Sequence, residues 1–197
     1  LLAEQGKLDL EAPLIRYFPE CGGKGKDGMT VRHLLTHSSG LPAGLPALPA
    51  WEGQAAAHAL ACARDVTDVP GTAFRYSDVN FILLGQLVHK VSGMPLDEFF
   101  RERITGPLGM VDTDFWVPED KRDRFAELYY RNPQTKQATK MPAPALAKKP
   151  TMLGGGGGLC GTASDYLRFT QMLMNRGELD GERILGSRTV DYMTRNH

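Results

Sequence analysis

Residues 29–42 have the sequence MTVRHLLTHSSGLP, and this stretch carries the strongest signals for the fold. Thr30 is a good N-cap because its hydroxyl can accept a backbone N–H of the first helical turn, so a short helix is predicted over residues 31–37. The following segment, residues 38–50, contains two glycines and three prolines and is predicted to be an irregular loop. Loops of this length in compact domains are often functional, and we expect this one to form a pocket wall.

His33 and His37 lie four residues apart on one face of that helix, which is a spacing used by metal ligands. The residues between them lack the glutamate of a zincin motif, and no third ligand cluster is evident. The favoured interpretation is a histidine that closes the helix end and bonds to nearby backbone.

The tripeptide Tyr76-Ser77-Asp78 stands between a turn at residues 70–72 and an apolar run at residues 81–85. It places a phenol, a hydroxyl and a carboxylate where a loop enters a helix, so the loop exposes these groups and the helix fixes them. Proton transfer by Tyr76 requires a neighbouring cation, because an unperturbed phenol titrates near pH 10 and is no base at neutral pH.

A purely structural interpretation of the tripeptide is equally open. Tyr76 would pack on Phe81 as a hydrophobic staple, Ser77 would cap the helix, and Asn80 would occupy the third helical position.

The remaining patterns indicate a helix-rich chain. Two adjoining apolar stripes over residues 79–91 predict a central helix that Gly93 terminates. The other expected elements are helices over residues 51–64, 95–104, 166–175 and 187–195, and a strand over residues 127–131 followed by a turn.

Five consecutive glycines occupy residues 154–158. No Lys-Ser or Lys-Thr pair follows them, which argues against a phosphate-binding loop, and we expect them to permit close approach of another backbone segment. The absence of a Gly-x-Ser-x-Gly elbow excludes the α/β-hydrolase class.

Composition restricts the function classes. The 23 basic and 23 acidic residues are interspersed and cancel, so a nucleic-acid partner is not expected. No apolar stretch approaches the roughly 18 residues needed for a transmembrane helix. The three cysteines argue against a disulfide framework and a cysteine-based zinc site, and inert thiols are expected. Residues 21–28, with four glycines and three charges, are expected to form a solvated loop.

Taken together, four segments resemble one family in their order along the chain. These are residues 29–42, residues 70–78, residues 107–110 (Pro-Leu-Gly-Met), and residues 155–165. The chain is similar to the serine β-lactamase-related hydrolases, which comprise class C β-lactamases, DD-peptidases and β-lactamase-like carboxylesterases. This resemblance implies a helix-rich α+β fold of the β-lactamase/DD-peptidase type. It also implies a helical domain over residues 27–144, with residues 1–26 and 145–197 belonging to the α/β sheet domain.

The family performs acyl transfer with a Ser-x-x-Lys helix, a Tyr-x-Asn loop and a Lys-Thr-Gly strand. The resemblance implies that Tyr76 is the catalytic general acid or base, with the lysine supplying the required cation. Ser77 and Asp78 are expected to bind substrate, a small-molecule ester, amide or β-lactam. Asp78 stands where the family often has Asn. An ionised carboxylate only accepts hydrogen bonds and cannot donate one to a substrate carbonyl, which argues against β-lactam recognition and leaves esters and peptides as candidate substrates. Neither a cofactor nor a metal is expected.

The other two elements are absent from the sequence. No serine is followed three residues later by lysine, no Lys-Thr-Gly occurs, and Lys26-Asp27-Gly28 is a poor substitute in a loop. The sequence also opens on a helix end that Gly6 terminates, so we expect a fragment with most of the antiparallel sheet missing. The nucleophile would then precede Leu1, and the strand would follow His197. The alternative is a non-catalytic penicillin-binding-like or interaction module.

Overall fold

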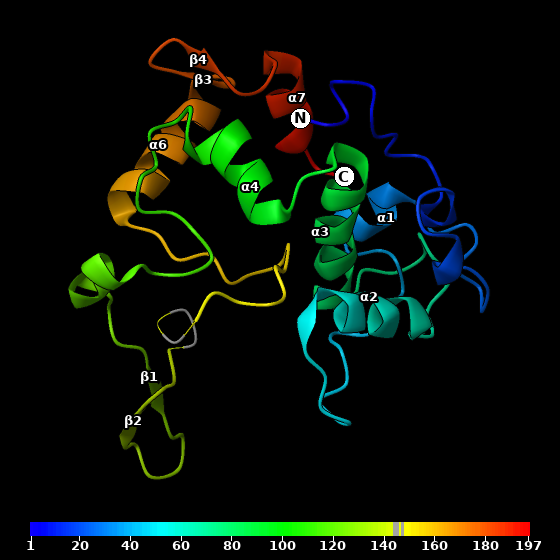
Figure 1. Cartoon of the computed structure of the whole chain (residues 1–197). Helices are drawn as coiled ribbons and strands as arrows, with labels where there is room; N and C mark the ends of the chain where they lie inside the picture. Colours follow the sequence, from blue (N-terminus) through cyan, green and yellow to red (C-terminus); the bar gives the residue numbers. More distant parts are fainter. Residues whose placement is uncertain (144–145, 147) are drawn as a thin grey trace.

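Helices dominate the computed structural model, which describes residues 1–143, 146 and 148–197 (Figure 1). In chain order its elements are η1 (Leu14–Arg16), η2 (Pro19–Cys21), α1 (Val31–Leu35), α2 (Gly53–Ala63), α3 (Asp78–Ser92), α4 (Leu96–Phe100), the π-turn η3 (Arg101–Thr105), η4 (Glu119–Arg124), β1 (Tyr129–Arg131), β2 (Ala138–Lys140), α6 (Ala163–Met174), β3 (Glu178–Leu179), β4 (Glu182–Arg183) and α7 (Ser187–Met193).

Helix α3 lies at the centre of the molecule and packs against α1, α2 and α4 (Figure 1). Val79, Leu83 and Leu87 are buried along it, as the two apolar stripes predict. Gly93 ends the helix in the left-handed region with φ 76°, and its N–H donates to the His89 carbonyl at 2.9 Å. The expected central helix is therefore confirmed, including its terminator.

Four helices are shorter than predicted, α2 and α7 by only one or two residues at an end, and α1 and α4 for local reasons. Helix α1 ends at Leu35 because His37 adopts φ 54°, which is outside the helical region. Its predicted cap is present, since the Thr30 hydroxyl accepts the His33 N–H at 3.3 Å. Helix α4 is regular only to Phe100 and continues as the wider π-turn η3.

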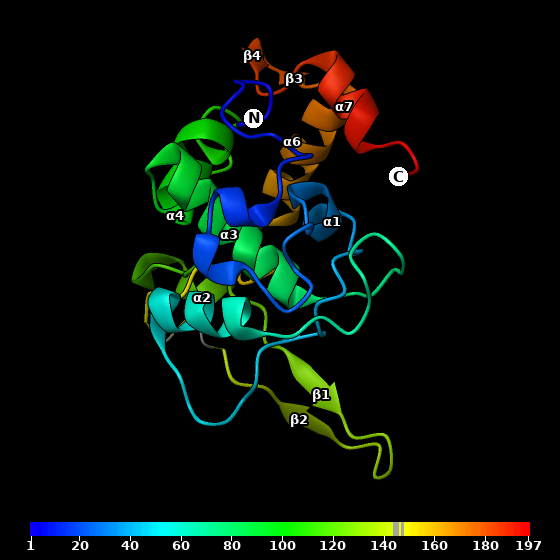
Figure 2. The ribbon, with the colours of Figure 1, turned by 90° about the vertical axis from the view of Figure 1, so that its right-hand side faces the viewer.

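The strands form two small antiparallel hairpins. Strand β1 pairs with β2 so that Tyr130 lies opposite Thr139, which confirms the predicted strand and the turn after it. Strand β3 pairs with β4 between α6 and α7. The β1–β2 hairpin extends away from the helices, as Figure 2 shows, and its residues are exposed.

Two apolar clusters form the core. One joins the segment before α1 to helices α1, α2 and α3, with members such as Leu14, Leu34 and Leu83. The second joins the segment after η3 to α6 and α7 through Leu108, Met172 and Val190. The predicted domain boundary at residues 144 and 145 lies outside the described residues, and the division into two domains stays a prediction.

The expectation of inert thiols is wrong for two of the three cysteines. Cys21 and Cys62, 41 residues apart, form a disulfide between η2 and α2. The fold brings together two residues whose sequence spacing gives no sign of pairing.

The expected solvated loop over residues 21–28 is wrong at Lys26, which is 2% exposed. Its ammonium group donates to the carbonyl oxygens of Cys62 and, at 2.9 Å, Arg64. These carbonyls lie at the C-terminal end of α2, where a helix has unpaired acceptors and a partial negative charge. Lys26 is buried because it caps this helix end.

Candidate active site

The tripeptide Tyr76-Ser77-Asp78 lies where the loop after residue 64 enters α3. The Tyr76 side chain is 62% exposed, and Asp78 is exposed as the first residue of the helix. Ser77 between them is fully buried. Among the described residues, no side chain or backbone group is hydrogen-bonded to the Tyr76 hydroxyl.

His37 holds the tripeptide from the end of α1. Its Nδ1 accepts the Ser77 backbone N–H at 3.1 Å and lies 3.2 Å from the Asn80 side-chain nitrogen. A ring nitrogen that accepts a backbone N–H carries no proton, so His37 is the neutral tautomer with its proton on Nε2. The rings of Tyr76 and Phe81 lie 4.6 Å and 5.1 Å from the His37 ring, centroid to centroid.

A buried polar pair lies behind His37. Ser39 and Asn80 are both fully buried, and the Ser39 hydroxyl donates to Asn80 Oδ1 at 2.6 Å. The same hydroxyl accepts the Leu41 N–H at 3.1 Å. Because both functional atoms of the Asn80 amide are engaged, its role in the fold is to lock α3 to the loop after α1.

This arrangement revises the structural interpretation of the tripeptide. Ser77 occupies the N-cap position of α3, but its hydroxyl donates to the Pro42 carbonyl at 2.6 Å and accepts no backbone N–H of the first helical turn. Asn80 is the third helical residue as expected, yet its side chain bonds to Ser39 and His37. Tyr76 stacks on His37, so a capping box and a Tyr76–Phe81 staple do not describe the site.

The Pro70-Gly71-Thr72 turn joins the same assembly. The Gly71 N–H donates to the Ser38 carbonyl at 2.8 Å. Gly71 has φ +88°, and a Cβ there would lie 3.0 Å from His33 Nε2, so glycine is required both for the backbone and for the close packing. The Arg75 N–H donates to the His37 carbonyl at 2.7 Å. This hydrogen bond fixes the backbone directly before Tyr76.

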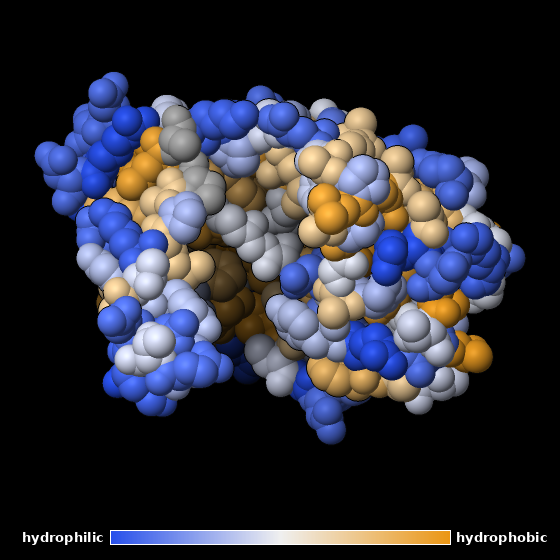
Figure 3. Space-filling model, turned by 90° about the horizontal axis from the view of Figure 1, so that it is seen from below, coloured by the Kyte–Doolittle hydropathy of each residue, from blue (hydrophilic) through white to orange (hydrophobic). Residues whose placement is uncertain are grey.

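An open cleft of about 760 Å³ begins beside Asp78. Figure 3 shows this face hollowed, with apolar residues in the depth of the hollow. The lining residues come from the start of α2, the first two turns of α3, Phe115, the segment before the glycine run and the glycine-rich loop itself. They are Trp51, Glu52, Gly53, Asp78, Ile82, Phe115, Lys148, Pro150, Thr151, Met152, Gly154 and residues 156–160.

The prediction that residues 38–50 form a wall of this cleft is therefore wrong. Among the described residues, the lining on this side begins at Trp51. Residues 38–50 instead support the tripeptide from behind, as the Asp78 N–H donates to the Ala43 carbonyl at 2.8 Å. The loop faces α3 with its backbone because its carbonyls accept the hydrogen bonds that the start of α3 offers.

The glycine run forms the opposite wall of the cleft by close backbone packing. A Cβ on Gly155 would lie 2.4 Å from the Phe81 carbonyl oxygen, and one on Gly85 would lie 3.0 Å from the Gly155 nitrogen. The expectation that these glycines permit a close backbone approach is confirmed. Gly156 lies beside Asp78, because a Cβ there would be 3.9 Å from Asp78 Oδ1.

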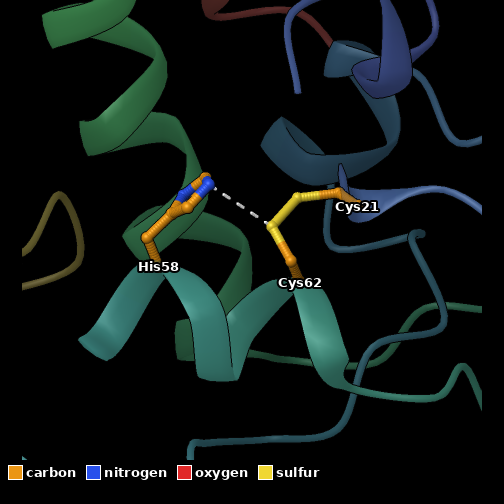
Figure 4. A group of neighbouring side chains, drawn as sticks. All are labelled: Cys21, His58 and Cys62. Carbon is orange, nitrogen blue, oxygen red and sulfur yellow. Dashed lines mark hydrogen bonds between the residues drawn. A yellow bond between two sulfur atoms is a disulfide. The ribbon is translucent and has the colours of Figure 1, made fainter. Parts of the chain in front are cut away.

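His33 of α1 and His37, just after the helix, do not form a metal site together. His33 Nδ1 accepts the Thr30 N–H at 3.2 Å, and His37 Nδ1 accepts the Ser77 N–H. Within residues 1–143, 146 and 148–197, the group with ligand atoms close enough to hold a metal lies elsewhere, at Cys21, His58 and Cys62 (Figure 4).

Sequence reasoning missed the organising role of His37 and its partners. The favoured interpretation, a histidine closing the helix end and bonding to backbone, is confirmed. Its partner, however, is 40 residues away in sequence. The sequence offers only Ser38 and Ser39 after His37 as a sign of this role, and two serines do not identify a contact 40 residues away.

Comparison with known proteins places this geometry in a family. The profile described as Beta-lactamase matches residues 1–196. The chain belongs to the beta-lactamase family. It has the helix-rich β-lactamase/penicillin-binding-protein-like fold that the resemblance implied.

Several members of the family are similar in sequence over nearly all of this chain. Protein Rv1367c of Mycobacterium tuberculosis is 31% identical over 98% of the chain and 54% of its own length. The esterase/beta-lactamase LipL of the same organism is 28% identical over 99% of the chain and 52% of its own length. The solved structure of EstCE1, a hydrolase with promiscuous acyltransferase activity, aligns with a TM-score of 0.74 and 25% identity over 96% of this chain and 57% of that one.

The chain spans about half the length of these beta-lactamase family relatives. In the part of the chain that the structure describes, every helix is too short or too polar to cross a membrane.

Proposed function

We propose that the chain is part of a serine hydrolase that acts by acyl-enzyme formation on an ester, amide or β-lactam bond. One observation carries the proposal: the half-buried His37, bonded to the buried Ser77 and Asn80, holds an exposed Tyr76 next to Asp78, which lines the cleft. A purely structural role at the start of a helix would not require a phenol that is both exposed to solvent and packed against a histidine ring.

In this proposal Tyr76 moves the proton. A serine hydroxyl attacks the substrate carbonyl, its proton passes to the Tyr76 phenolate, and the phenol then protonates the leaving group. The exposed, unbonded Tyr76 hydroxyl leaves room for the serine and for a lysine ammonium that stabilises the phenolate. Because no serine here is followed at the right spacing by lysine, both groups are assigned to a longer protein, and residues 1–197 alone are proposed to be inactive.

Asp78 and Ser77 have different parts in the proposal. Asp78 faces the cleft and is assigned to orient the substrate or the lysine as a hydrogen-bond acceptor. The predicted substrate-binding role of Ser77 would be indirect, since its buried hydroxyl bonds to Pro42 and fixes the positions of Tyr76 and Asp78.

A fluorophosphonate probe, which forms a covalent bond with an activated serine, tests the proposal. We expect labelling of the full-length protein and none of residues 1–197 alone. The matched variant Tyr76→Phe in the full-length protein is expected to label more slowly while its unfolding transition is unchanged.

Labelling of the 197-residue chain would contradict the assignment of the nucleophile to another part of the protein. A full-length protein that neither labels nor hydrolyses p-nitrophenyl esters would favour the non-catalytic penicillin-binding-like or interaction module.

A further inference from the structure

Four polar side chains that the proposed reaction does not use converge between η2 and α2. Cys21 and Cys62 form the disulfide, and His58 Nε2 lies 3.6 Å from Cys62 Sγ (Figure 4). The same imidazole nitrogen lies 2.8 Å from Glu20 Oε1. One ligand atom each from Cys21, His58 and Cys62 lies within 4.8 Å of the others.

The spacing of these residues orients them toward one point. His58 and Cys62 are four residues apart on α2 and therefore share one helix face. Glu20 and Cys21 are adjacent in η2, which packs against that face. Two short elements thus each supply one sulfur and one nitrogen or oxygen ligand.

The donor set suits zinc. Zn²⁺ takes thiolate, imidazole and carboxylate ligands in tetrahedral geometry, with Zn–S near 2.3 Å and Zn–N near 2.0 Å, so neighbouring sulfur and nitrogen ligands lie roughly 3.5 Å apart. The 3.6 Å between His58 Nε2 and Cys62 Sγ matches this spacing. Two thiolates would balance the charge of the cation inside a site where both cysteines are buried.

The other ring nitrogen of His58, Nδ1, leaves Nε2 as the atom that binds the metal. His58 Nδ1 is buried and has no hydrogen-bond partner among the described residues. The His58 side chain lines a hollow of about 380 Å³ together with residues such as Gln86, His89 and Lys90. A metal-bound histidine usually donates its other N–H to a carboxylate, carbonyl or water, and Nδ1 is the nitrogen that remains for this contact when Nε2 binds the metal.

We propose that Cys21, Cys62, His58 and Glu20 form a redox-controlled zinc site. A dithiol reductant donates two electrons and two protons to the Cys21–Cys62 disulfide, which becomes two thiols while the reductant becomes a disulfide. Zn²⁺ then displaces the two thiol protons and binds both thiolates, His58 Nε2 and the Glu20 carboxylate. In the reverse direction a disulfide, the oxidised form of that reductant, takes two electrons from the thiolates and two protons from water, which re-forms the Cys21–Cys62 disulfide and releases Zn²⁺.

Both the disulfide form and the zinc-bound form would hold the C-terminal end of α2 against η2. The N-terminal end of the same helix lines the cleft through Gly53, and Gln54 Oε1 accepts the Leu153 N–H at 2.7 Å next to the glycine-rich wall. Helix α2 therefore connects the site to the cleft.

Cobalt titration tests the proposal independently of hydrolase activity. The 197-residue chain is reduced anaerobically with a phosphine, which is then removed, and Co²⁺ is added as the spectroscopic probe. We expect one equivalent to give a thiolate-to-cobalt charge-transfer band that Zn²⁺ abolishes. The oxidised chain is expected to give no band, and Cys160→Ser, which removes the third cysteine, is expected to leave the band unchanged.

Variants separate this site from adventitious binding by cysteines. Cys62→Ser is expected to lose the band, and Glu20→Gln, which keeps both cysteines, is expected to bind roughly 10-fold more weakly or worse. His58→Gln is expected to weaken binding at least as much. Absence of the band in the reduced wild type would overturn the proposal, and so would unchanged affinity in both His58→Gln and Glu20→Gln.

Discussion

His37 Nδ1 accepts the backbone N–H of Ser77 at 3.1 Å, across 40 residues of sequence. This contact links the end of α1 to the start of α3 and holds Tyr76 and Asp78 on either side of a buried residue. It also requires a residue that tolerates a positive φ, since His37 has φ 54°.

Replacement of His37 by alanine is expected to destabilise the fold by about 1–3 kcal/mol, because the buried N–H of Ser77 and the Asn80 amide lose an acceptor. His37→Asn is the matched control. Asparagine tolerates a positive φ and presents a side-chain oxygen near the position of Nδ1, so a smaller loss is expected. Urea unfolding of the three proteins measures the difference, and equal losses in both variants would argue against the hydrogen bond as the cause.

Replacement of Tyr76 by phenylalanine in the full-length protein is expected to lower kcat by roughly 10²–10⁴, the usual worth of a positioned acid or base. The ring remains to stack on His37, and the removed hydroxyl makes no hydrogen bond among the described residues, so the unfolding midpoint should stay the same. Ester hydrolysis and thermal unfolding of the same preparation provide both measurements. An unchanged rate would leave Tyr76 with only a packing role.

Replacement of Gly155 by alanine is expected to cost about 1–3 kcal/mol of stability and to disturb the cleft wall. The new Cβ would lie 2.4 Å from the Phe81 carbonyl oxygen, which cannot move without distorting α3. Gly157→Ala is the control in the same run, because nothing lies within 4 Å of a Cβ there, and its effect should stay within about 0.5 kcal/mol. Similar losses in both variants would contradict a specific contact between Gly155 and α3.

Burial lowers the pKa of His33 in the folded chain, while Glu11 opposes this shift and Arg32 adds to it. Below the unfolded-state pKa of about 6.5, the unfolded chain then binds more protons than the folded chain, so stability falls as the pH falls toward the folded-state pKa. Above pH about 6.5 the histidine contributes no pH dependence.

We therefore expect His33→Gln to lose less stability than the wild type between about pH 7 and about pH 5, measured by urea unfolding. Glutamine is chosen because it retains a side-chain acceptor at the third helical position for the Thr30 N–H. An identical pH dependence in the two proteins would show that His33 does not titrate in this range.

Much of the local structure could be predicted from the sequence. The Thr30 cap, the apolar stripes of α3 and the Gly93 terminator depend on residues within a few positions of one another, and the structure confirms them. The close packing of the glycine run was also foreseeable, because consecutive glycines remove every Cβ from a segment.

Three of the errors share one cause, which is a partner distant in sequence. Lys26 looked solvated until the end of α2 supplied its acceptors, and Cys21 looked unpaired until the same helix supplied Cys62. Ser77 looked like a helix cap, but the Pro42 carbonyl accepts its hydroxyl. In each case a tertiary contact outweighed the local preference.

The sequence by itself determined which segments form helices, the Thr30 cap, the Gly93 terminator and the entry of the Tyr76 segment into a central helix, because capping and apolar periodicity act over one or two turns. Only the tertiary structure decided which groups meet: His37 with Ser77, Gly155 with Phe81, and Cys21 and Glu20 with Cys62 and His58. Buried polar groups must find partners wherever the packed chain offers them, and that choice depends on the whole fold rather than on neighbouring residues.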